Sequence, residues 1–408
     1  MNTSVDVTIL PEVRQDIWNY CDKPSLKVLS VCCKRFYAEV KPFVWKRVEL
    51  SWQFLEVITK ELMKKPHPNI QLISCLVLGA PSLSASSLRN PSWGYFSFGF
   101  VRLLDRCERL KSLTMCNFLP VDGLRLVSEN LPQLENLELR GITLRADDLK
   151  PLHGLLQLKS LTLRQCSTKN KHWNLIWQLE SLENLTVTHC STPAFLAFFR
   201  GGCSWKNLRS LDFFHIVECP GLYSCIAKRS VKLESLKLTG SSIQDSDILN
   251  VSHLPRLKFI HLFGADQITD LGISYLTHLP CLERLKISAC HNLSPHCLED
   301  IAKIQTLRSL DLDQFSEDAN DISCLANLVN LHTLVISRID LGLTDDALRV
   351  VAQLKSLRKL DIRDNNFTEE GIGHLAQLPH LRTLELNTNN INIERLEKYG
   401  LLGKVRIS

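Results

Sequence analysis

Leucines recur along most of this chain in a phrase of the form L-x-x-L-x-L. Between Leu282 and Leu307, Leu285 and Ile287 are two residues apart, so both side chains point to one side of an extended strand. Farther along, Leu298 and Ile301 follow the spacing of a helix. The stretch therefore predicts one strand, one turn and one helix.

The phrase begins again every 24 to 26 residues, which indicates a tandem repeat. A single unit buries too few leucines to offset the conformational entropy of ordering its backbone, so the units must stack. The sequence predicts an α/β solenoid with parallel strands on one face and helices on the other. Its regular repeats begin at Leu110, Leu134, Leu158, Leu182, Leu208, Leu233, Leu257, Leu282, Leu307, Leu331, Leu357 and Leu381, with a further copy at Ile73.

Residues at the end of each strand identify the type of repeat. Cys166, Cys190 and Cys290 occupy the corner after the strand, and Asn365 and Asn389 take the same place in later repeats. The pattern resembles the cysteine-containing class of leucine-rich repeats. The resemblance implies a right-handed horseshoe with strands on the concave face and helices on the convex face. Residues 110–408 are assigned to this solenoid, whose last edge we expect Leu402, Val405 and Ile407 to close.

Helix starts are predicted where a capping residue precedes the helical pattern. The candidates are Thr269-Asp270, Ser294-Pro295, Thr344-Asp345 and Thr368-Glu369.

Residues 51–109 are less regular than the rest. They contain the repeat at Ile73 and then a loop near residues 79–100 that is rich in Gly, Ser and Pro. The loop also carries Trp93, Tyr95, Phe96, Phe98 and Phe100. These aromatics favour a loop folded back on the first repeats over an exposed binding finger.

Residues 8–50 have helical periodicity and no repeat phrase, which predicts a group of short helices. The stretch resembles an F-box in Pro11-Glu12-Val13, Ser25-Leu26, Leu29 to Cys32, Lys34-Arg35-Phe36 and Trp45. It departs from the family at Ile9-Leu10, where the family opens Leu-Pro, and at Arg14 and Cys21. An ordinary helical cap on the repeats is the alternative.

The F-box resemblance implies a function. Such a chain is the substrate-recognition subunit of an SCF-type ubiquitin ligase, which docks on a Skp adaptor and, through it, on cullin and RING subunits. The repeats would hold a protein substrate for ubiquitination and proteasomal degradation. The adaptor-binding residues implied by the resemblance are Ile9, Leu10, Pro11, Val13, Ile17, Leu26, Leu29 and Trp45.

Composition narrows the class of protein. The 408 residues are 45% hydrophobic and 22% charged, and the net charge of +5 gives no case for nucleic acid binding. The N-terminus does not have the pattern of a signal peptide and no apolar run is long enough to cross a membrane, so we expect a chain in the cytoplasm or nucleus. The 15 cysteines are then expected to be free thiols.

The sequence offers little catalytic chemistry. It contains no phosphate-binding Gly-rich loop, no H-E-x-x-H and no G-x-S-x-G, and a solenoid spreads its polar groups over a broad surface. The neighbours His189-Cys190, Cys290-His291 and His296-Cys297 lack the spacing of zinc ligands. We therefore expect an adaptor that is not an enzyme and holds neither metal nor cofactor.

The third, fifth and seventh residues of each phrase are predicted to face the concave side. In the middle repeats these candidate substrate-binding residues are Phe214, Phe259, His261, Phe263, Arg284 and Lys286. Aromatics there could anchor a partner, or they could pack on one another and stabilise the sheet. In later repeats the same positions carry Asp311, Asp313, Asp361 and Glu385, which would favour a basic segment in the partner.

Two other functions stay open. One is an interaction scaffold without any ligase, which would not co-purify with an adaptor. The other is a small-molecule co-receptor similar to the plant hormone F-box proteins. That function needs a basic pocket, for which Arg140, Arg164, Arg284 and Lys286 are the candidates.

Overall fold

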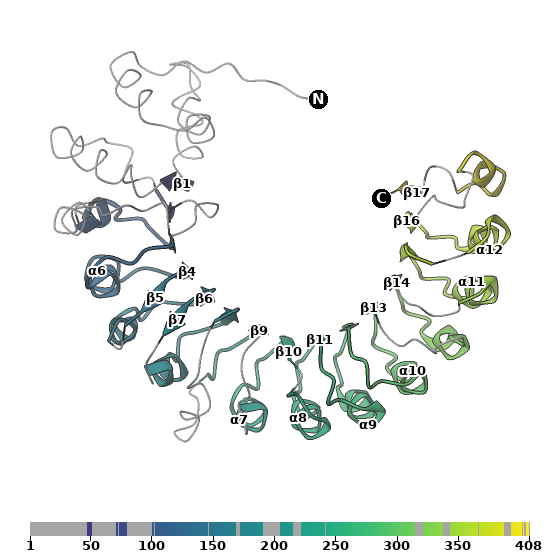
Figure 1. The fold of residues 1–408 in the computed structure, drawn as a ribbon, viewed down its shortest axis with the longest axis horizontal. Coiled ribbons are helices and arrows are strands. Elements are labelled where there is room, and N and C mark those ends of the chain that lie inside the picture. Colours follow the sequence, from purple (N-terminus) through teal and green to yellow (C-terminus); the bar gives the residue numbers. More distant parts are fainter. Residues whose placement is uncertain are drawn as a thin grey trace, which may run out of the picture. The chain divides into compact units, whose positions relative to one another are not determined.

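In the computed structural model the chain divides into two compact units, Met1–Phe198 and Phe199–Ser408. The residues that the structure describes are 47–50, 71, 73–79, 100–101, 103–145, 147–168, 172–190, 205–214, 222–240, 242–314, 321–337, 343–365, 367–386, 393–401, 403 and 405–407. Each unit is a row of parallel strands with helices along one side, as Figure 1 shows for each of them.

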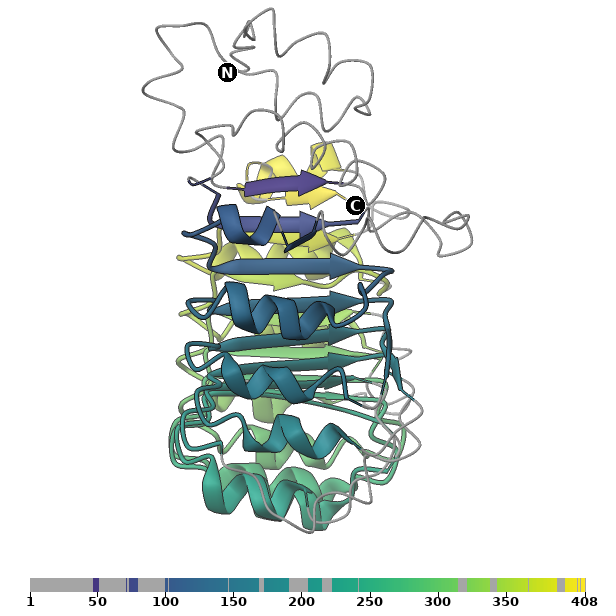
Figure 2. The same cartoon turned by 90° about the vertical axis from the view of Figure 1, so that its left-hand side faces the viewer.

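The first unit contains strands paired in the order of the chain, and all the pairs are parallel. They are β1 (Arg47–Leu50), β2 (Cys75–Leu78), β3 (Ser112–Cys116), β4 (Asn136–Arg140), β6 (Ser160–Arg164) and β8 (Asn184–Thr188). Figure 2 shows these strands one above the other with their arrows in the same direction. The helical segments beside them are α6 (Gly123–Asn130), η3 (Lys150–Gly154) and η4 (His172–Gln178), and β5 (Thr143–Leu144) pairs with β7 (Ser167–Thr168).

The second unit repeats the same arrangement, again with parallel pairs in the order of the chain. Its strands are β9 (Ser210–Phe214), β10 (Ser235–Thr239), β11 (Phe259–Phe263), β12 (Arg284–Ser288), β13 (Ser309–Asp313), β14 (Thr333–Ser337), β15 (Lys359–Asp361), β16 (Thr383–Leu386) and β17 (Val405–Ile407). Its helices are α7 (Leu222–Arg229), α8 (Asp245–Val251), α9 (Asp270–Tyr275), η6 (Leu276–His278), α10 (Cys297–Ile301), η7 (Ser323–Asn327), α11 (Asp345–Val351), α12 (Glu369–Gly373), η8 (His374–Gln377) and η9 (Ile393–Tyr399).

These strands confirm the predicted repeats. The register joins equivalent positions, for example Leu285 with Leu310, so the leucines of successive repeats stack into one core within a unit. Leu282, Leu285 and Ile287 are each no more than 1% exposed. The described part of the chain is thus a leucine-rich-repeat solenoid, and β17 pairs with β16 at the predicted last edge.

The corner residues perform the role expected of their class. The residue before the corner takes a left-handed backbone, as at Gln165 and Gly264, and the chain turns away from the sheet there. The Cys166 thiol donates to the Leu139 carbonyl at 3.4 Å, and the Asn365 amide donates to the Ile336 carbonyl at 2.7 Å. Both bonds reach the preceding repeat, so the corner joins neighbours through a backbone oxygen. No disulfide joins the described cysteines.

On the helix side, neighbouring repeats share a carboxylate. Asp245, at the start of α8, accepts hydrogen bonds from the Thr269 amide at 2.8 Å and the Thr269 hydroxyl at 2.7 Å. Asp345 accepts the same pair of bonds from Thr368. The predicted starts of α9, α11 and α12 are confirmed. At the predicted start Ser294-Pro295, the Ser294 hydroxyl accepts a hydrogen bond from the His296 amide at 3.2 Å, as a capping residue does, and also bonds to Asp270. A turn at Pro295 and His296 then leads into α10, which begins at Cys297.

Two predicted boundaries also need correction. The α-helical module was predicted to extend through residue 50, but Arg47–Leu50 forms β1 and pairs with β2. The alternation of Val48 and Leu50 with polar residues has the period of a strand. The predicted loop near residues 79–100 does not include Phe100, which is helical and fully buried. The remaining residues of the predicted F-box, 8–46, lie outside the described residues.

Candidate functional site

The predicted substrate-binding residues lie on one face of the sheet in the second unit. Phe214 is on β9, Phe259, His261 and Phe263 are on β11, and Arg284 and Lys286 are on β12. The alternate residues of β9 and β11 are buried, whereas these side chains are at least partly exposed. The facing predicted from the repeat phrase is therefore correct. We call these six residues and their immediate neighbours the sheet-face site.

The aromatic residues of the sheet-face site contact one another. The Phe214 and Phe263 ring centroids are 5.5 Å apart with the rings tilted by 36°. Thr239 on the intervening strand β10 is opposite Phe263 and is 7% exposed. The His261 ring meets Phe263 edge-on at 6.2 Å. The mutual packing that the sequence left open is thus present, and both phenylalanines still keep part of their surface open to a partner.

The cations of the site also have partners in this chain. The Arg284 guanidinium lies over the Phe259 ring, 4.9 Å from its centroid, which is within the range of a cation–π interaction. The Lys286 ammonium is 2.7 Å from an Asp311 carboxylate oxygen, and Lys237 is 2.6 Å from Asp212. Such compensation argues against a basic pocket. The other two candidates for that pocket, Arg140 and Arg164, both pair with Glu138 in the first unit.

Three polar atoms of the sheet-face site are buried without a hydrogen-bond partner among the described residues. They are His261 Nε2, Ser288 Oγ and Asp311 Oδ1. The register places His261 beside Lys286, Lys286 beside Asp311, and Ser288 beside Phe263. A buried polar atom without a partner costs free energy, so three on adjacent strands are notable. Sequence reasoning missed Ser288, although its seventh position in the phrase could have indicated it.

Burial shifts the pKa of two of these groups. Burial first, and then the charges of Lys286 and Lys237, lower the pKa of His261 to about 4. The imidazole is therefore neutral at pH 7 and can both donate and accept a hydrogen bond. Burial raises the pKa of Asp311 against the opposing effect of Lys286. Donors and acceptors thus lie beside an aromatic surface, which suits recognition of a mixed polar and apolar side chain.

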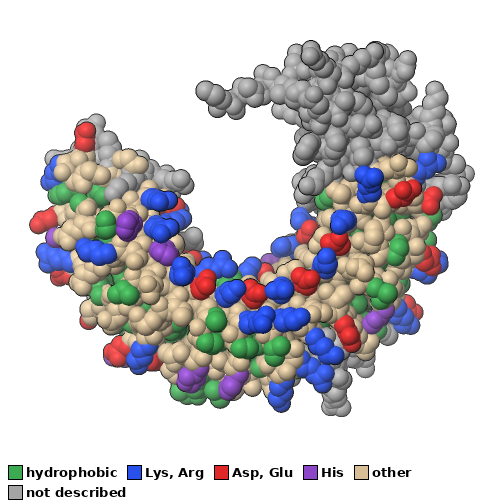
Figure 3. Space-filling view, turned by 180° about the vertical axis from the view of Figure 1, so that it is seen from behind, with side chains coloured by type: hydrophobic (Ala, Val, Ile, Leu, Met, Phe, Trp, Pro, Cys, Tyr) green, Lys and Arg blue, Asp and Glu red, His purple; other side chains and the backbone are tan. Residues whose placement is uncertain are grey.

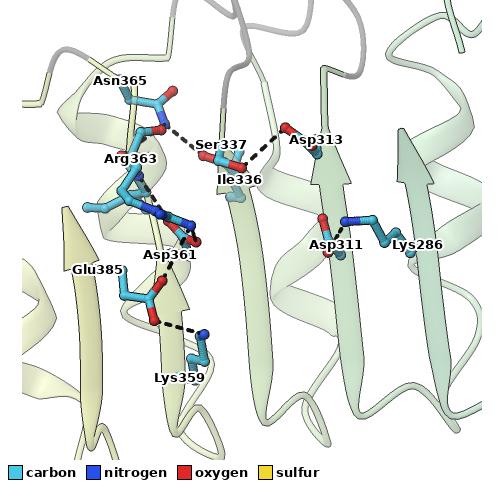
Figure 4. A network of polar contacts seen from close by, with 11 residues as sticks. Lys286, Asp311, Asp313, Ile336, Ser337, Lys359, Asp361, Arg363, Asn365 and Glu385 are labelled. Atoms are coloured by element: carbon cyan, nitrogen blue, oxygen red, sulfur yellow. Dashed lines mark hydrogen bonds and ion pairs between the residues drawn. The ribbon is translucent and has the colours of Figure 1, made fainter. Parts of the chain in front are cut away.

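Two of the acidic positions of the later repeats, Asp361 and Glu385, form a separate network, shown in Figure 4. Arg363 donates to both oxygens of Asp361, at 2.8 and 2.6 Å, and Lys359 lies 2.9 Å from Glu385. Asp361 is only 2% exposed. Burial would raise its pKa, but the bonds from Arg363 outweigh burial and lower it. These acids are neutralised within the chain, so the expected preference for a basic segment loses its basis.

The described residues offer neither a cluster of metal ligands nor a membrane-spanning helix. No group of three or more His, Cys, Asp or Glu residues there could hold a metal ion. Among the same residues, no helix has the length and apolar character needed to cross a membrane. The predicted adaptor-binding residues Ile9, Leu10, Pro11, Val13, Ile17, Leu26, Leu29 and Trp45 lie outside the described part of the chain.

Known proteins are similar to parts of this chain. No family model matches the chain. It is 26% identical over 208 residues to the "Putative adenylate cyclase regulatory protein" of Trypanosoma equiperdum, which is 51% of this chain and 31% of that protein. The chain thus spans less than a third of the length of this relative. An internalin from Listeria monocytogenes, 19% identical, is similar in structure with a TM-score of 0.49 over 74% of this chain and 88% of the internalin.

Proposed function

We propose that this protein is a non-catalytic adaptor that binds another protein through the sheet-face site. The observation that supports this proposal most is the combination of partly exposed rings and unpartnered polar atoms on neighbouring strands. Half-exposed aromatic side chains act as anchors in protein interfaces, and truncating a buried anchor typically costs about 2 kcal/mol or more. A partner side chain would complete the hydrogen bonds of His261, Ser288 and Asp311.

The sequence supports a more specific role. The resemblance of residues 8–50 to an F-box indicates a substrate-recognition subunit of an SCF-type ubiquitin ligase. In that role the first residues dock on the Skp adaptor, and the repeats hold a substrate lysine close to a charged ubiquitin-conjugating enzyme. The chain would contribute proximity, since an increase in effective concentration requires no catalytic group of its own.

Adaptor capture tests the ligase role. The double variant Leu10→Ala/Pro11→Ala should lose capture of the Skp adaptor while the repeats remain folded. A matched control is Leu156→Ala, because Leu156 is an apolar residue that is 75% exposed in the repeat domain. Full adaptor capture by the double variant would rule out the ligase role and leave an interaction scaffold.

The sheet-face site is tested separately with Phe259→Ser/Phe263→Ser. Both rings lie outside the leucine core, so the melting temperature should fall only slightly, in line with about 0.2 to 1 kcal/mol per cross-strand pair. Proteins that co-purify with the wild-type chain should be lost, apart from the adaptor. A strong fall in melting temperature with partners retained by the folded fraction would show that the rings serve stability alone. A small molecule as the ligand would instead appear as capture that disappears on dialysis.

A further inference from the structure

The edge of the sheet at which the strands begin carries one polar residue per repeat, directly after the first leucine. In the second unit Arg209, Glu234 and Lys258 occupy this position in turn. Glu234 Oε1 is 2.8 Å from Arg209, and Glu234 Oε2 is 3.0 Å from Lys258. One carboxylate thus bridges the cations of the two flanking repeats. The bonds to Lys258 and Arg209 lower the pKa of Glu234.

The first unit contains the same bridge. Glu135 lies 2.7 Å from Lys111 and 3.2 Å from Lys159, which precede and follow it by one repeat. The alternation of charge along this edge is therefore a recurring feature of the repeats. It stops after Glu283, since the equivalent residues in the next four repeats are Arg308, His332, Arg358 and Arg382.

We call these four residues the basic row. Arg308, Arg358 and Arg382 are exposed and make no ion pair with any residue the structure describes. The segments that lead into the four strands, residues 303–309, 327–333, 353–359 and 377–383, contain no Asp or Glu. Figure 3 looks onto this edge, where blue and purple side chains gather at the C-terminal end of the second unit and red and blue alternate before it.

The environment of His332 shows that the row is electropositive. Burial and then the charges of Arg358 and Arg308 lower the pKa of His332. Lys355 adds a further ammonium close to the row, held by the Ala352 carbonyl at 2.8 Å and the Gln377 carbonyl at 3.3 Å. The row therefore has a positive charge that no carboxylate of the described chain balances as Glu234 balances its neighbours.

The shape of the row selects the kind of partner. Adjacent strands lie about 4.8 Å apart, so Arg308 and Arg382 are separated by roughly 14 Å, the length of about four residues of extended chain. Three residues farther along the strands lie Asp311, Asp361 and Glu385, about 10 Å from the row. These carboxylates pair with Lys286, Arg363 and Lys359, so the unbalanced positive charge is confined to the row itself. A duplex nucleic acid or an anionic membrane would reach past the row without meeting further unbalanced cations, whereas a single peptide strand can follow it along its whole length.

We infer that the basic row binds an extended acidic segment of a partner protein, whose Asp or Glu side chains lie between successive repeats as Glu135 and Glu234 do within this chain. Arginine suits this role because its guanidinium stays charged and can hold a carboxylate through two hydrogen bonds. The site is separate from the sheet-face site and requires neither that site nor the F-box.

The test is a variant in which positive and negative residues alternate along the basic row. In full-length His332→Glu/Arg382→Glu the row would read plus, minus, plus, minus, as it does in the earlier repeats. The control Lys206→Gln/Lys228→Glu changes the net charge by the same amount at two exposed positions away from the row. Fluorescence anisotropy with labelled decaglutamate at low salt should show at least tenfold weaker binding for the first variant and less than a twofold change for the control. Melting curves should show both variants folded.

Binding of decaglutamate should weaken as salt is raised, because these charges are exposed to solvent. Equal weakening by the two variants would show a general charge effect and overturn the inference, as would a wild-type chain that does not bind the peptide. Tighter binding of an oligothymidylate of the same charge would also overturn it, in favour of a nucleic acid surface. A failure of adaptor capture by the F-box leaves these outcomes unchanged.

Discussion

Neighbouring repeats are joined differently on the helix side and on the strand side of the solenoid. On the helix side, the Asp345 carboxylate accepts two hydrogen bonds from Thr368 of the next repeat and lies directly over Gly371. On the strand side, Phe263 contacts Phe214 and Lys286 contacts Asp311, yet each of these side chains keeps part of its surface exposed. Tight packing on the helix side thus stabilises the solenoid, whereas the strand side has exposed surface that a partner can contact.

The largest expected effect is on the helix side, at Gly371. An added Cβ there would lie closer than 3.0 Å to three atoms of the Asp345 side chain. Asp345 would have to move and lose its bonds to Thr368, so Gly371→Ala should lower the free energy of unfolding by about 3 kcal/mol. Urea denaturation of the full-length chain measures this change.

Gly154→Ala is the control for Gly371→Ala. A Cβ at Gly154 would meet Ser128 Cβ at 3.4 Å, an ordinary contact, so its cost should stay below about 0.5 kcal/mol. Equal destabilisation by the two alanines would show that the glycine–aspartate contact does not limit the packing of repeats.

A smaller effect is expected at the hydroxyl that joins the same two repeats. Thr368→Val keeps the shape of the side chain but removes the bond to Asp345 and the cap bond to the Gly371 amide, which is 3.2 Å long. The expected loss is about 1 to 2 kcal/mol. Thr344→Val is a matched control, because Thr344 precedes α11 in the same way but its hydroxyl makes no cap bond. Identical midpoints in urea for the two valine variants would contradict the proposed link.

The difference between the two sides also decides what the sequence could predict. The strands, their facing and most helix starts follow from leucine spacing and capping residues, because these are local or strictly periodic signals. The bond from Ser294 to Asp270 of the preceding repeat could not be predicted in this way, because the two residues are 24 positions apart in the sequence. The contacts of the sheet-face site depend in the same way on which side chains become neighbours across strands.

Two features of the fold do not follow from the spacing of the leucines. They are the contact between Gly371 and Asp345 and the charge of the basic row. Nothing near Gly371 in the sequence indicates Asp345, which precedes it by a full repeat. The alternation of Arg209, Glu234 and Lys258 is visible in the sequence once the repeats are aligned, but its meaning comes from the bridging distances. The basic row could have been found from the sequence. It appears when the repeats are aligned by their leucines and the residue after the first leucine is compared from one repeat to the next.

The smallest expected effect is on the strand side, at His261. Its pKa is about 4 in the folded chain, against the usual 6.5, so between these values the unfolded chain binds more protons than the folded one. The free energy of unfolding should therefore rise with pH in this window, and the contribution should be complete above pH 6.5. The cause is burial beside Lys286 and Lys237, with Asp212 opposing them.

His261→Gln removes this titration and keeps a polar side chain of similar size. Urea midpoints measured from pH 4 to 7 should have a shallower slope for the variant than for the wild-type chain, and the two should differ least at the high end. The expected difference is small, since the imidazole is partly exposed and solvent weakens its interaction with both lysines. An unchanged slope would show that His261 accepts a proton as readily in the folded chain as in the unfolded one. The neutral donor and acceptor that the sheet-face site offers to a partner at pH 7 would then lose this support, while the helix-side links would be unaffected.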